Sequence, residues 1–396
     1  MKRFLSLIIC LTLILSMFCG CSDSSSSKKS HEKEVIQFAS SSFIDSFALL
    51  YSDGTVAVAD EYLFNPTLEV LDWQNVEKIW NFVGTIIGLH EDGTVSCTDP
   101  DYDFSHLKNV VDICFLEPDV AFYFLLEDNS VDFVGYDALK PSDFDSWTSV
   151  KKMIPYGYES LFVINQDGTM HDTSNLISRE ELPFWTDITD IFFGERIYGL
   201  KENGSVVICN LYPDFVPFIP NEEHSLAGAE KIYPFYDIAL GLTGNGEVLV
   251  SGGEDWFRNV WCQSYDYLSL SDFSEFTDIK QLEVGKYTYR YDDTVALKND
   301  GTVVALDQNF QPYVSQWRDI EKLVVSYDIF SGISVICGLK SDGTVSALEF
   351  DDYGKLTHYP NFFMGWQVTD IFAHDYCGIV GICPDGSVVT TNYTTR

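Results

Sequence analysis

The chain has 396 residues, of which 46% are hydrophobic and 15% aromatic, and its formal net charge is -36. This hydrophobic content can bury a large core, either in two or three domains or in one large repeat domain. The excess of carboxylates argues against nucleic acid and anionic membrane surfaces as partners, because both require a basic surface, and it indicates a solvated acidic exterior.

Residues 1–20 are predicted to be a signal peptide. Two basic residues precede the uncharged run Phe4–Phe18, which is short for a membrane span and typical of the apolar part of a secretion signal. Gly20 and Cys21 follow, and the segment resembles a bacterial lipoprotein signal, in which the cysteine is lipidated. The two residues before Gly20 differ from those usual in that family, so conventional cleavage and an uncleaved anchor are the alternatives. The resemblance implies an extracytoplasmic protein anchored to the bacterial cell membrane as a lipoprotein.

Residues 21–34 are predicted to be the lipidated cysteine and a flexible tether. After Cys21 the sequence SDSSSSKKSHEKE contains no apolar residue, so this segment cannot pack against a core. The folded domain is expected to occupy residues 35–396.

From residue 35 onward the sequence repeats a β-hairpin. Turn sites of Asp or Asn followed by Gly, or once by Asn, recur at spacings of 36 to 55 residues. Leu or Ile stands three residues before each turn, and Thr or Ser follows eight of the nine turns. Such dipeptides between apolar runs are the strongest local signal of a hairpin. The turn sites are Asp53-Gly54, Asp92-Gly93, Asp128-Asn129, Asp167-Gly168, Asn203-Gly204, Asn245-Gly246, Asp300-Gly301, Asp342-Gly343 and Asp385-Gly386.

The clearest hairpin spans residues 295–306. Its Asp-Gly pair at 300–301 favours a two-residue type I′ turn, in which both central residues have positive φ. That turn would place Leu297 opposite Val304 and Ala296 opposite Ala305. Both faces of this hairpin are apolar, so it needs a neighbouring sheet on each side.

A second motif precedes most hairpins and predicts a tight lead-in followed by a first strand. It consists of an aromatic residue with apolar residues three and six positions later, as at Trp317, Ile320 and Leu323. Units of about 40 residues with three or four strands each indicate a propeller or a solenoid, and strands that are apolar on both sides favour stacked blades. We therefore expect an all-β protein, a β-propeller built from about nine repeats, with seven to nine blades.

These two motifs resemble the repeats of the regulator of chromosome condensation family in a degenerate bacterial form. The match is clearest at Ala296–Val303 and Gly338–Val345, and it runs from about Val35 to Thr395. It implies a propeller, which in this family usually has seven blades. The glycine-rich segment that follows the third strand in the family is absent here. No residue matches a motif for nucleotide exchange on a small GTPase, so that activity is not expected.

No motif indicates an enzyme, a cofactor or a metal site. The sequence has no P-loop, GxGxxG, GxSxG or HExxH pattern. The segment at 99–103 begins like a calcium loop but lacks the Gly and Glu of an EF-hand, and the seven histidines are scattered. The ten cysteines include no CxxC pair, so those beyond the signal are expected to be mainly buried and to act as small hydrophobic residues.

Aromatic residues gather in the connections that should leave one end of the repeats. Counting strand reversals places the loop between strands one and two, and the exit of strand three, opposite the Asp-Gly turns. Tyr and Trp on loops supply large contact areas at small entropic cost, although such rings can instead cap the edges of blades. The candidate binding residues are Tyr287, Tyr289, Arg290, Tyr291, Trp256, Phe257, Trp261, Tyr353 and Tyr359.

The expected protein is a monomeric, membrane-tethered binding protein with a protein partner, no cofactor, and no membrane contact beyond its lipid anchor. A propeller of the resembled family that inhibits β-lactamase shows this mode of binding. Glycan or cell-wall binding, with rings stacked on sugars, is one alternative. An enzyme whose site is not visible in the sequence is the other.

Overall fold

The structure is a computed structural model of the 396-residue chain. It describes residues 33–41, 46–59, 68–116, 121–135, 140–141, 144–157, 160–177, 182–194, 196–210, 222–223, 226–235, 238–252, 273–284, 294–328, 333–351, 355–357, 363, 365–374 and 378–391. The chain divides into two compact units: unit 1 comprises residues 1–73 and 287–396, and unit 2 comprises residues 74–286. Among the described residues, no helix has the length and hydrophobicity that a membrane span requires.

Unit 1 contains three antiparallel sheets and the hairpin at 295–305. The sheets are β1–β4, β24–β26 and β27–β29, and the hairpin is β22–β23. The bounds are β1 (Val35–Ser40), β2 (Phe47–Tyr51), β3 (Val56–Ala59), β4 (Leu68–Val70), β22 (Val295–Lys298), β23 (Val303–Ala305), α2 (Gln311–Val314), β24 (Ile320–Asp328), β25 (Ile333–Lys340), β26 (Val345–Asp351), β27 (Asp370–His374), β28 (Gly378–Ile382) and β29 (Val388–Thr390).

Unit 2 contains five antiparallel sheets, β5–β7, β8–β10, β11–β13, β14–β17 and β18–β20, together with strand β21. The bounds are β5 (Val76–Phe82), β6 (Thr85–His90), β7 (Val95–Cys97), β8 (Val110–Leu116), β9 (Ala121–Leu126), β10 (Val131–Gly135), η2 (Phe144–Ser146), β11 (Val150–Tyr156), β12 (Ser160–Asn165), β13 (Met170–Asp172), η3 (Leu182–Phe184), β14 (Ile188–Phe193), β15 (Arg196–Lys201), β16 (Val206–Asn210), β17 (Glu222–Glu223), β18 (Ala229–Phe235), β19 (Ile238–Thr243), β20 (Val248–Gly252) and β21 (Ile279–Glu283).

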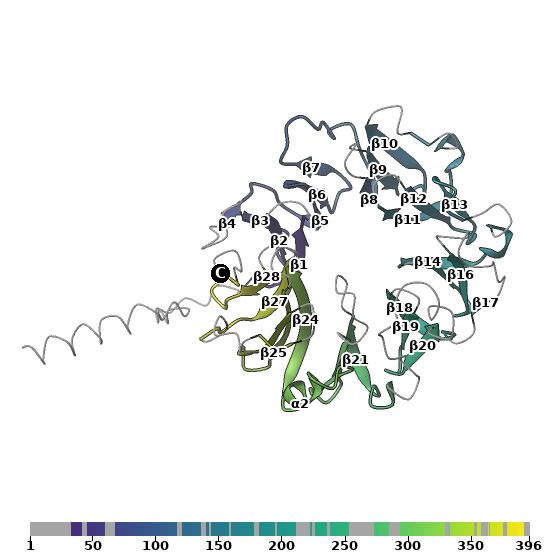
Figure 1. Ribbon diagram of the computed structural model, residues 1–396. Coiled ribbons are helices and arrows are strands. Elements are labelled where there is room, and N and C mark those ends of the chain that lie inside the picture. The colour runs from purple at the N-terminus through teal and green to yellow at the C-terminus, as the bar shows by residue number, and fades with distance from the viewer. Residues whose placement is uncertain are drawn as a thin grey trace, which may run out of the picture. The chain divides into compact units, whose positions relative to one another are not determined.

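The predicted all-β repeat architecture is confirmed. Within the two units the described strands form eight small antiparallel sheets of three or four strands, besides hairpin β22–β23 and strand β21, and neighbouring strands of a sheet follow one another in the sequence (Figure 1). One sheet per repeat is the organisation of a β-propeller, and this is the fold class of the chain. Among the described residues the first strand begins at Val35, and the apolar residue of the lead-in motif starts the first strand of a repeat at Val76, Ile188 and Ile320, as expected.

The turn at 300–301 differs from the predicted type. Leu297 pairs with Val303 instead of Val304. The register is therefore shifted by one residue from the predicted one, and the loop has three residues instead of two. The N–H of Gly301 donates to the carbonyl of Lys298 at 3.0 Å. Of the two turn residues only Gly301 has a positive φ, +79°. This geometry is a type I turn followed by a glycine bulge, in place of type I′.

The aspartate side chain explains this choice of turn. Asp300 Oδ1 accepts hydrogen bonds from the Thr302 N–H at 2.9 Å and from the Thr302 hydroxyl at 2.6 Å. An Asp that accepts a bond from the residue two positions ahead stabilises such a turn without positive φ of its own. Thr or Ser after the turn is therefore part of the turn. The same pair of bonds forms at Asp53, Asp92, Asp128, Asp167, Asn203, Asp342 and Asp385.

In several repeats the turn glycine also joins one repeat to the next. In unit 1 the Ile320 N–H donates to the Gly301 carbonyl at 3.0 Å, and in unit 2 the Ile188 N–H donates to the Gly168 carbonyl at 3.0 Å. The residue just before each donor is in the left-handed region, with φ of 59° at both Asp319 and Asp187. The backbones meet so closely that a Cβ at position 168 would lie 2.5 Å from the Asp187 Cα.

The aromatic residue of the lead-in packs on a glycine in strand two. Trp185 covers Gly199 so closely that a Cβ there would lie 2.5 Å from Cζ3 of the ring. Trp366 covers Gly381 in the same way, with the corresponding distance 2.8 Å. The lead-in thus folds back on its own blade, which is why a large ring recurs before the first strand.

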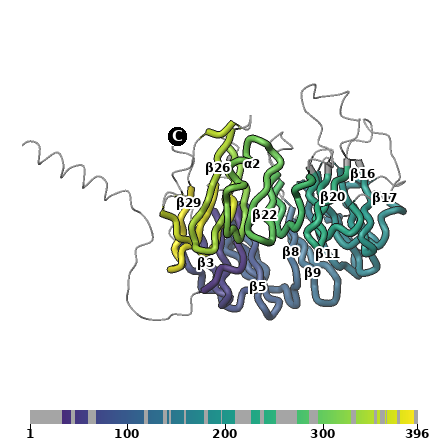
Figure 2. Tube along the Cα trace, turned by 90° about the horizontal axis from the view of Figure 1, so that it is seen from below, coloured from purple at the N-terminus to yellow at the C-terminus, as the bar shows by residue number. Residues whose placement is uncertain are grey.

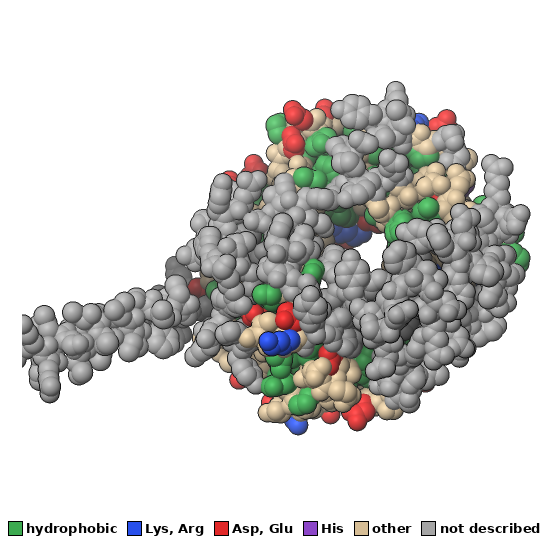
Figure 3. Space-filling view, viewed as in Figure 1, with side chains coloured by type: hydrophobic (Ala, Val, Ile, Leu, Met, Phe, Trp, Pro, Cys, Tyr) green, Lys and Arg blue, Asp and Glu red, His purple; other side chains and the backbone are tan. Residues whose placement is uncertain are grey.

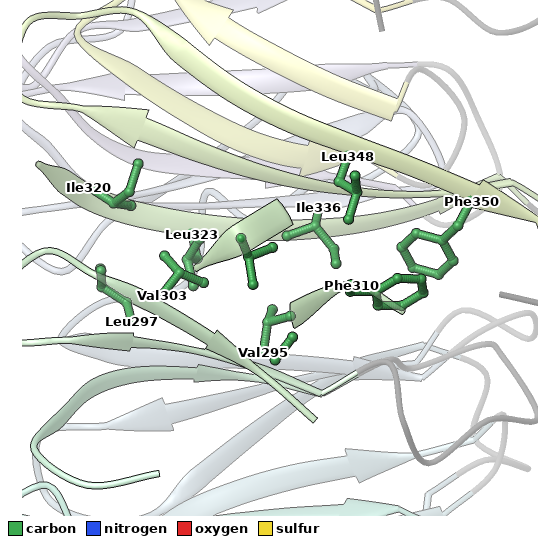
Figure 4. Packing of buried hydrophobic residues seen from close by; sticks show 11 residues of the cluster. Val295, Leu297, Val303, Phe310, Ile320, Leu323, Ile336, Leu348 and Phe350 are labelled. Atoms are coloured by element: carbon green, nitrogen blue, oxygen red, sulfur yellow. The ribbon is translucent and has the colours of Figure 1, made fainter. Parts of the chain in front are cut away.

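The hydrophobic core lies between consecutive sheets within each unit. Figure 4 shows hairpin β22–β23 packed against β24–β26, with Phe310 and Phe350 ring to ring at 4.3 Å between centroids. Both rings are fully buried, and each such side chain stabilises the fold by about 1.5–3 kcal/mol. The first and last sheets of unit 1 also pack together, through Phe47 and Val380 among others, although they are far apart in the sequence (Figures 1 and 2).

Candidate functional site

The two ends of each sheet differ in their connections. In sheet β24–β26, Asp328 and Asp351 both pair with Ile333, so the β24–β25 loop and the exit of β26 lie at one end. The Asp342-Gly343 turn lies at the other. Sheet β18–β20 has the same arrangement. We name the end with the Asp-Gly or Asn-Gly turn the turn end of a sheet, and the opposite end its loop end. The predicted strand reversals are confirmed in these sheets.

The predicted binding residues follow strands that finish at loop ends. The segment with Trp256 follows Gly252, the last residue of β20, and the segment with Tyr353 follows Asp351. The segment with Tyr287 ends before β22. The side chains themselves lie outside the described residues, so their clustering and exposure stay predictions. This holds for Cys21 and for Tyr287, Tyr289, Arg290, Tyr291, Trp256, Phe257, Trp261, Tyr353 and Tyr359.

Some aromatic residues in the described connections pack inward. Phe104, in the β7–β8 connection, is 3% exposed, and its ring lies 5.3 Å from that of Phe122 and 5.1 Å from that of Phe124. The Phe104 ring therefore caps a blade edge, as the alternative explanation of the aromatic loops expects.

Aromatic residues of two further segments differ in how far they are buried. Tyr156, at the end of β11, is half-buried and stacks on Phe193 with 4.5 Å between ring centroids. Phe184, in the lead-in to β14, is 52% exposed. Packing is therefore common but not general among the described connection aromatics.

Seven of the nine turn sites place an aspartate at the same position of the turn. The Thr302 hydroxyl and N–H lower the pKa of Asp300. The equivalent bonds from Thr94 and Thr344 lower the pKa values of Asp92 and Asp342. These carboxylates are exposed and ionised at neutral pH. Figure 3 shows Asp and Glu side chains at several places on the described surface, with fewer Lys and Arg side chains.

First strands of neighbouring sheets are joined by lysine–aspartate pairs at one repeated position. The Nζ–Oδ1 distance is 2.7 Å for Lys152 and Asp190 in unit 2. It is also 2.7 Å for Lys322 and Asp370 in unit 1. These side chains are partly exposed, so each pair is worth about 0–1 kcal/mol and mainly fixes how the blades line up.

The described residues contain no assembled catalytic or metal centre. No group of three or more His, Cys, Asp or Glu among them could hold a metal ion. Burial raises the pKa values of the Cys114 and Cys337 thiols, so neither is a reactive thiolate. In the calcium-like segment, Asp99 Oδ1 accepts from the Asp101 N–H at 2.9 Å, which makes it a local turn.

No protein-family model matches this chain, and no curated protein matches it. Solved structures similar to it include a computationally designed protein, Ika8, at 14% identity and TM-score 0.42, covering 92% of this chain and 98% of that one. Sqt1 from Saccharomyces cerevisiae is similar at 12% identity and TM-score 0.41, covering 91% and 97%. Prp20p from the same yeast, described with its binding to Gsp1p and histones, has 14% identity and TM-score 0.29, covering 57% and 59%. Scores this low add nothing to what the sheets themselves establish.

Proposed function

We propose that this protein is an extracytoplasmic binding protein, tethered to the membrane through Cys21, that holds a protein partner at the loop ends of its β-propeller. The observation that carries the proposal is the sorting of connections by sheet end. Asp351, at the exit of β26, lies at the loop end and leads directly into the segment with Tyr353 and Tyr359.

The two sheet ends suit different tasks. Turn ends are closed by three-residue loops. Their side-chain hydrogen bonds restrict which residues can stand there, as at Asp300 and Thr302. Loop ends carry the long connections, and surface loops on a rigid scaffold are where binding residues concentrate. The Tyr, Trp and Arg of the candidate set are the residue types that dominate binding energy in protein interfaces.

The test is affinity capture from envelope extracts, with the protein that begins at Ser22 as bait. Tyr289→Ala and Trp256→Ala should each lose the captured partner, with binding weakened by about 2 kcal/mol or more. Ser341→Ala, in the exposed turn-end loop of β25–β26, is the matched control and should capture as the unsubstituted protein does. Melting temperatures should stay the same for all three variants.

Two outcomes would contradict the proposal. If Tyr289→Ala and Trp256→Ala lower the melting temperature and leave capture unchanged, the rings belong to the core. If the protein captures no protein but binds glycans on a sugar array, the loop ends bind cell-wall material instead.

A further inference from the structure

The chain joins unit 1 at a turn end. β1 starts at Val35, which pairs with Tyr51 beside the turn of the first repeat. Just before β1, the Ser52 N–H donates to the Glu34 carbonyl at 2.8 Å, and the Glu34 N–H donates to the Ser52 hydroxyl at 3.3 Å. These two hydrogen bonds hold Glu34, where the upstream segment enters unit 1, against this turn.

A lysine fixes the same attachment point with its side chain. Lys33 Nζ lies 2.6 Å from Asp53 Oδ2 and donates to the Thr55 hydroxyl at 3.0 Å. It also lies 5.8 Å from the centroid of the Tyr51 ring. The last two residues of the predicted tether are thus part of the folded unit, which shortens the predicted tether to residues 22–32.

We propose that an anchor at Cys21 holds unit 1 with its turn ends toward the membrane and its loop ends away from it. The loop ends would then meet proteins in the aqueous phase beyond the membrane, and not proteins embedded beside the anchor. This inference rests on the proposed function, because it takes Cys21 as the anchored residue.

Chain length supports this orientation. Residues 22 to 32 span at most about 36–40 Å even when fully extended. The nine residues of β24 make the distance from turn end to loop end about 30 Å. To bring a loop end to the bilayer, the segment would have to run the length of a sheet at close to full extension. Such extension is entropically unfavourable for a chain of this composition.

The charge of the turn ends limits how close unit 1 comes to the lipid. The exposed turn residues of unit 1 include Asp53, Asp300, Asp342 and Asp385. Their pKa values are lowered by bonds from Lys33 and Thr55 at Asp53, and from the Thr or Ser two residues ahead at the others. They therefore stay negative, and anionic headgroups repel them within a Debye length of about 10 Å at 0.1 M salt. The turn ends face the membrane without docking on it.

The test measures the distance of each end of one sheet from a bilayer. Ser341→Cys places a dye at the turn end of β24–β26, and Lys355→Cys places one just beyond β26 at the loop end; both positions are exposed. The full-length mature protein is bound to phosphatidylcholine vesicles that contain a rhodamine-labelled lipid as energy acceptor. The efficiency of energy transfer to the lipid should be about twofold or more higher from a dye at position 341 than from one at position 355. The reason is their separation of about 25–30 Å along the sheet. Unsubstituted protein labelled in parallel gives the background from native thiols.

A second arm separates this inference from the lipidation of Cys21. Full-length Cys21→Ser protein with a hexahistidine tag before Ser22 is bound to nickel-chelating lipid in the same vesicles, and mass spectrometry tests the native chain for acylation. If energy transfer is greater from position 341 in this arm and the native chain is not acylated, the lipid anchor at Cys21 is refuted. The orientation that attachment at this point imposes on unit 1 is then kept. Equal transfer from both positions, or more from 355, would overturn the orientation even with an acylated Cys21.

Discussion

Replacing Gly168 by Ala should destabilise the protein more than the same change at Gly386. Both glycines have positive φ, +77° and +83°, so both variants force Ala into the left-handed region. That strain costs about 1–2 kcal/mol, and the loss of glycine's freedom in the unfolded chain offsets about 0.4–1 kcal/mol of it. A Cβ at 386 meets no atom within 4 Å, so Gly386→Ala should cost about 0–1.6 kcal/mol.

At position 168 the contact with the next repeat adds to this cost. A Cβ there would lie 2.5 Å from the Asp187 Cα and 2.9 Å from its N, both backbone atoms that cannot rotate away. The junction must open, which weakens the 3.0 Å bond from the Ile188 N–H to the Gly168 carbonyl and the 2.8 Å bond from the Glu202 N–H to the Asp187 carbonyl. Two such bonds contribute about 0.5–1.5 kcal/mol each, so with the strain the total for Gly168→Ala should be about 1–5 kcal/mol.

The assay is urea unfolding followed by tryptophan fluorescence, with Gly386→Ala as the matched control. Gly301→Val is an intermediate case, because a Cβ at 301 lies 3.3 Å from the Asp319 Cα, and it should cost about 1–3 kcal/mol. Equal losses for Gly168→Ala and Gly386→Ala would refute the close junction between repeats.

Three other changes test separate features. Gly199→Ala should cost about 1–3 kcal/mol in the same urea assay, because the new Cβ would lie 2.5 Å from the Trp185 ring; an unchanged midpoint would show that the lead-in does not pack there. Lys33→Met should make stability less sensitive to acid: hydrogen bonds from Lys33 and Thr55 lower the pKa of Asp53 from 3.8 to about 2, so this contribution is complete above about pH 4 and is lost as the pH falls through about 2. Identical midpoint-versus-pH curves for Lys33→Met and the unsubstituted protein would contradict that linkage. Cys21→Ser should release the protein from membranes or leave an unprocessed precursor, seen by fractionation and immunoblotting; normal processing and an unchanged membrane fraction would count against lipidation.

The hairpin at 300–301 shows how far local sequence determines this fold. The Asp-Gly pair predicted the position of the turn and the positive φ of Gly301, and both are confirmed. It did not determine the turn type, because the same dipeptide suits a type I′ turn and a type I turn with a glycine bulge. Thr302 decides between them through its bonds to Asp300, and the recurrence of Thr or Ser at that position was the signal that could have given the correct register.

The sequence indicated the lead-in motif but not the glycine that its aromatic residue covers. Its aromatic residue predicted the start of the first strand, but the glycine that it covers lies in strand two, more than a dozen residues later, as with Trp185 and Gly199. Glycines at this position recur in several repeats, at Gly88, Gly199, Gly241, Gly338 and Gly381. A glycine inside a strand usually marks a close approach by another group, so this pattern was readable in the sequence.

The role of the loop aromatics could not be predicted in the same way. Phe104 and Phe310 stand in connections between repeats, as do Tyr353 and Trp256, yet both Phe104 and Phe310 are buried. Composition does not separate a ring that caps a blade from one that faces a partner, because either places an aromatic residue beside the end of a strand. The difference depends on how the connection folds over the sheet.

Solvent accessibility of the loop aromatics is therefore the most direct test of the proposed function. Hydroxyl-radical footprinting with mass spectrometry can compare Tyr287, Tyr289, Tyr291, Trp256 and Trp261 with the buried standards Tyr123 and Trp185, which are 1% and 2% exposed. A binding surface at the loop ends predicts that the five candidates are oxidised much faster than the two standards. Oxidation of the candidates as slow as that of Tyr123 and Trp185 would place the rings under their own loops and contradict the account.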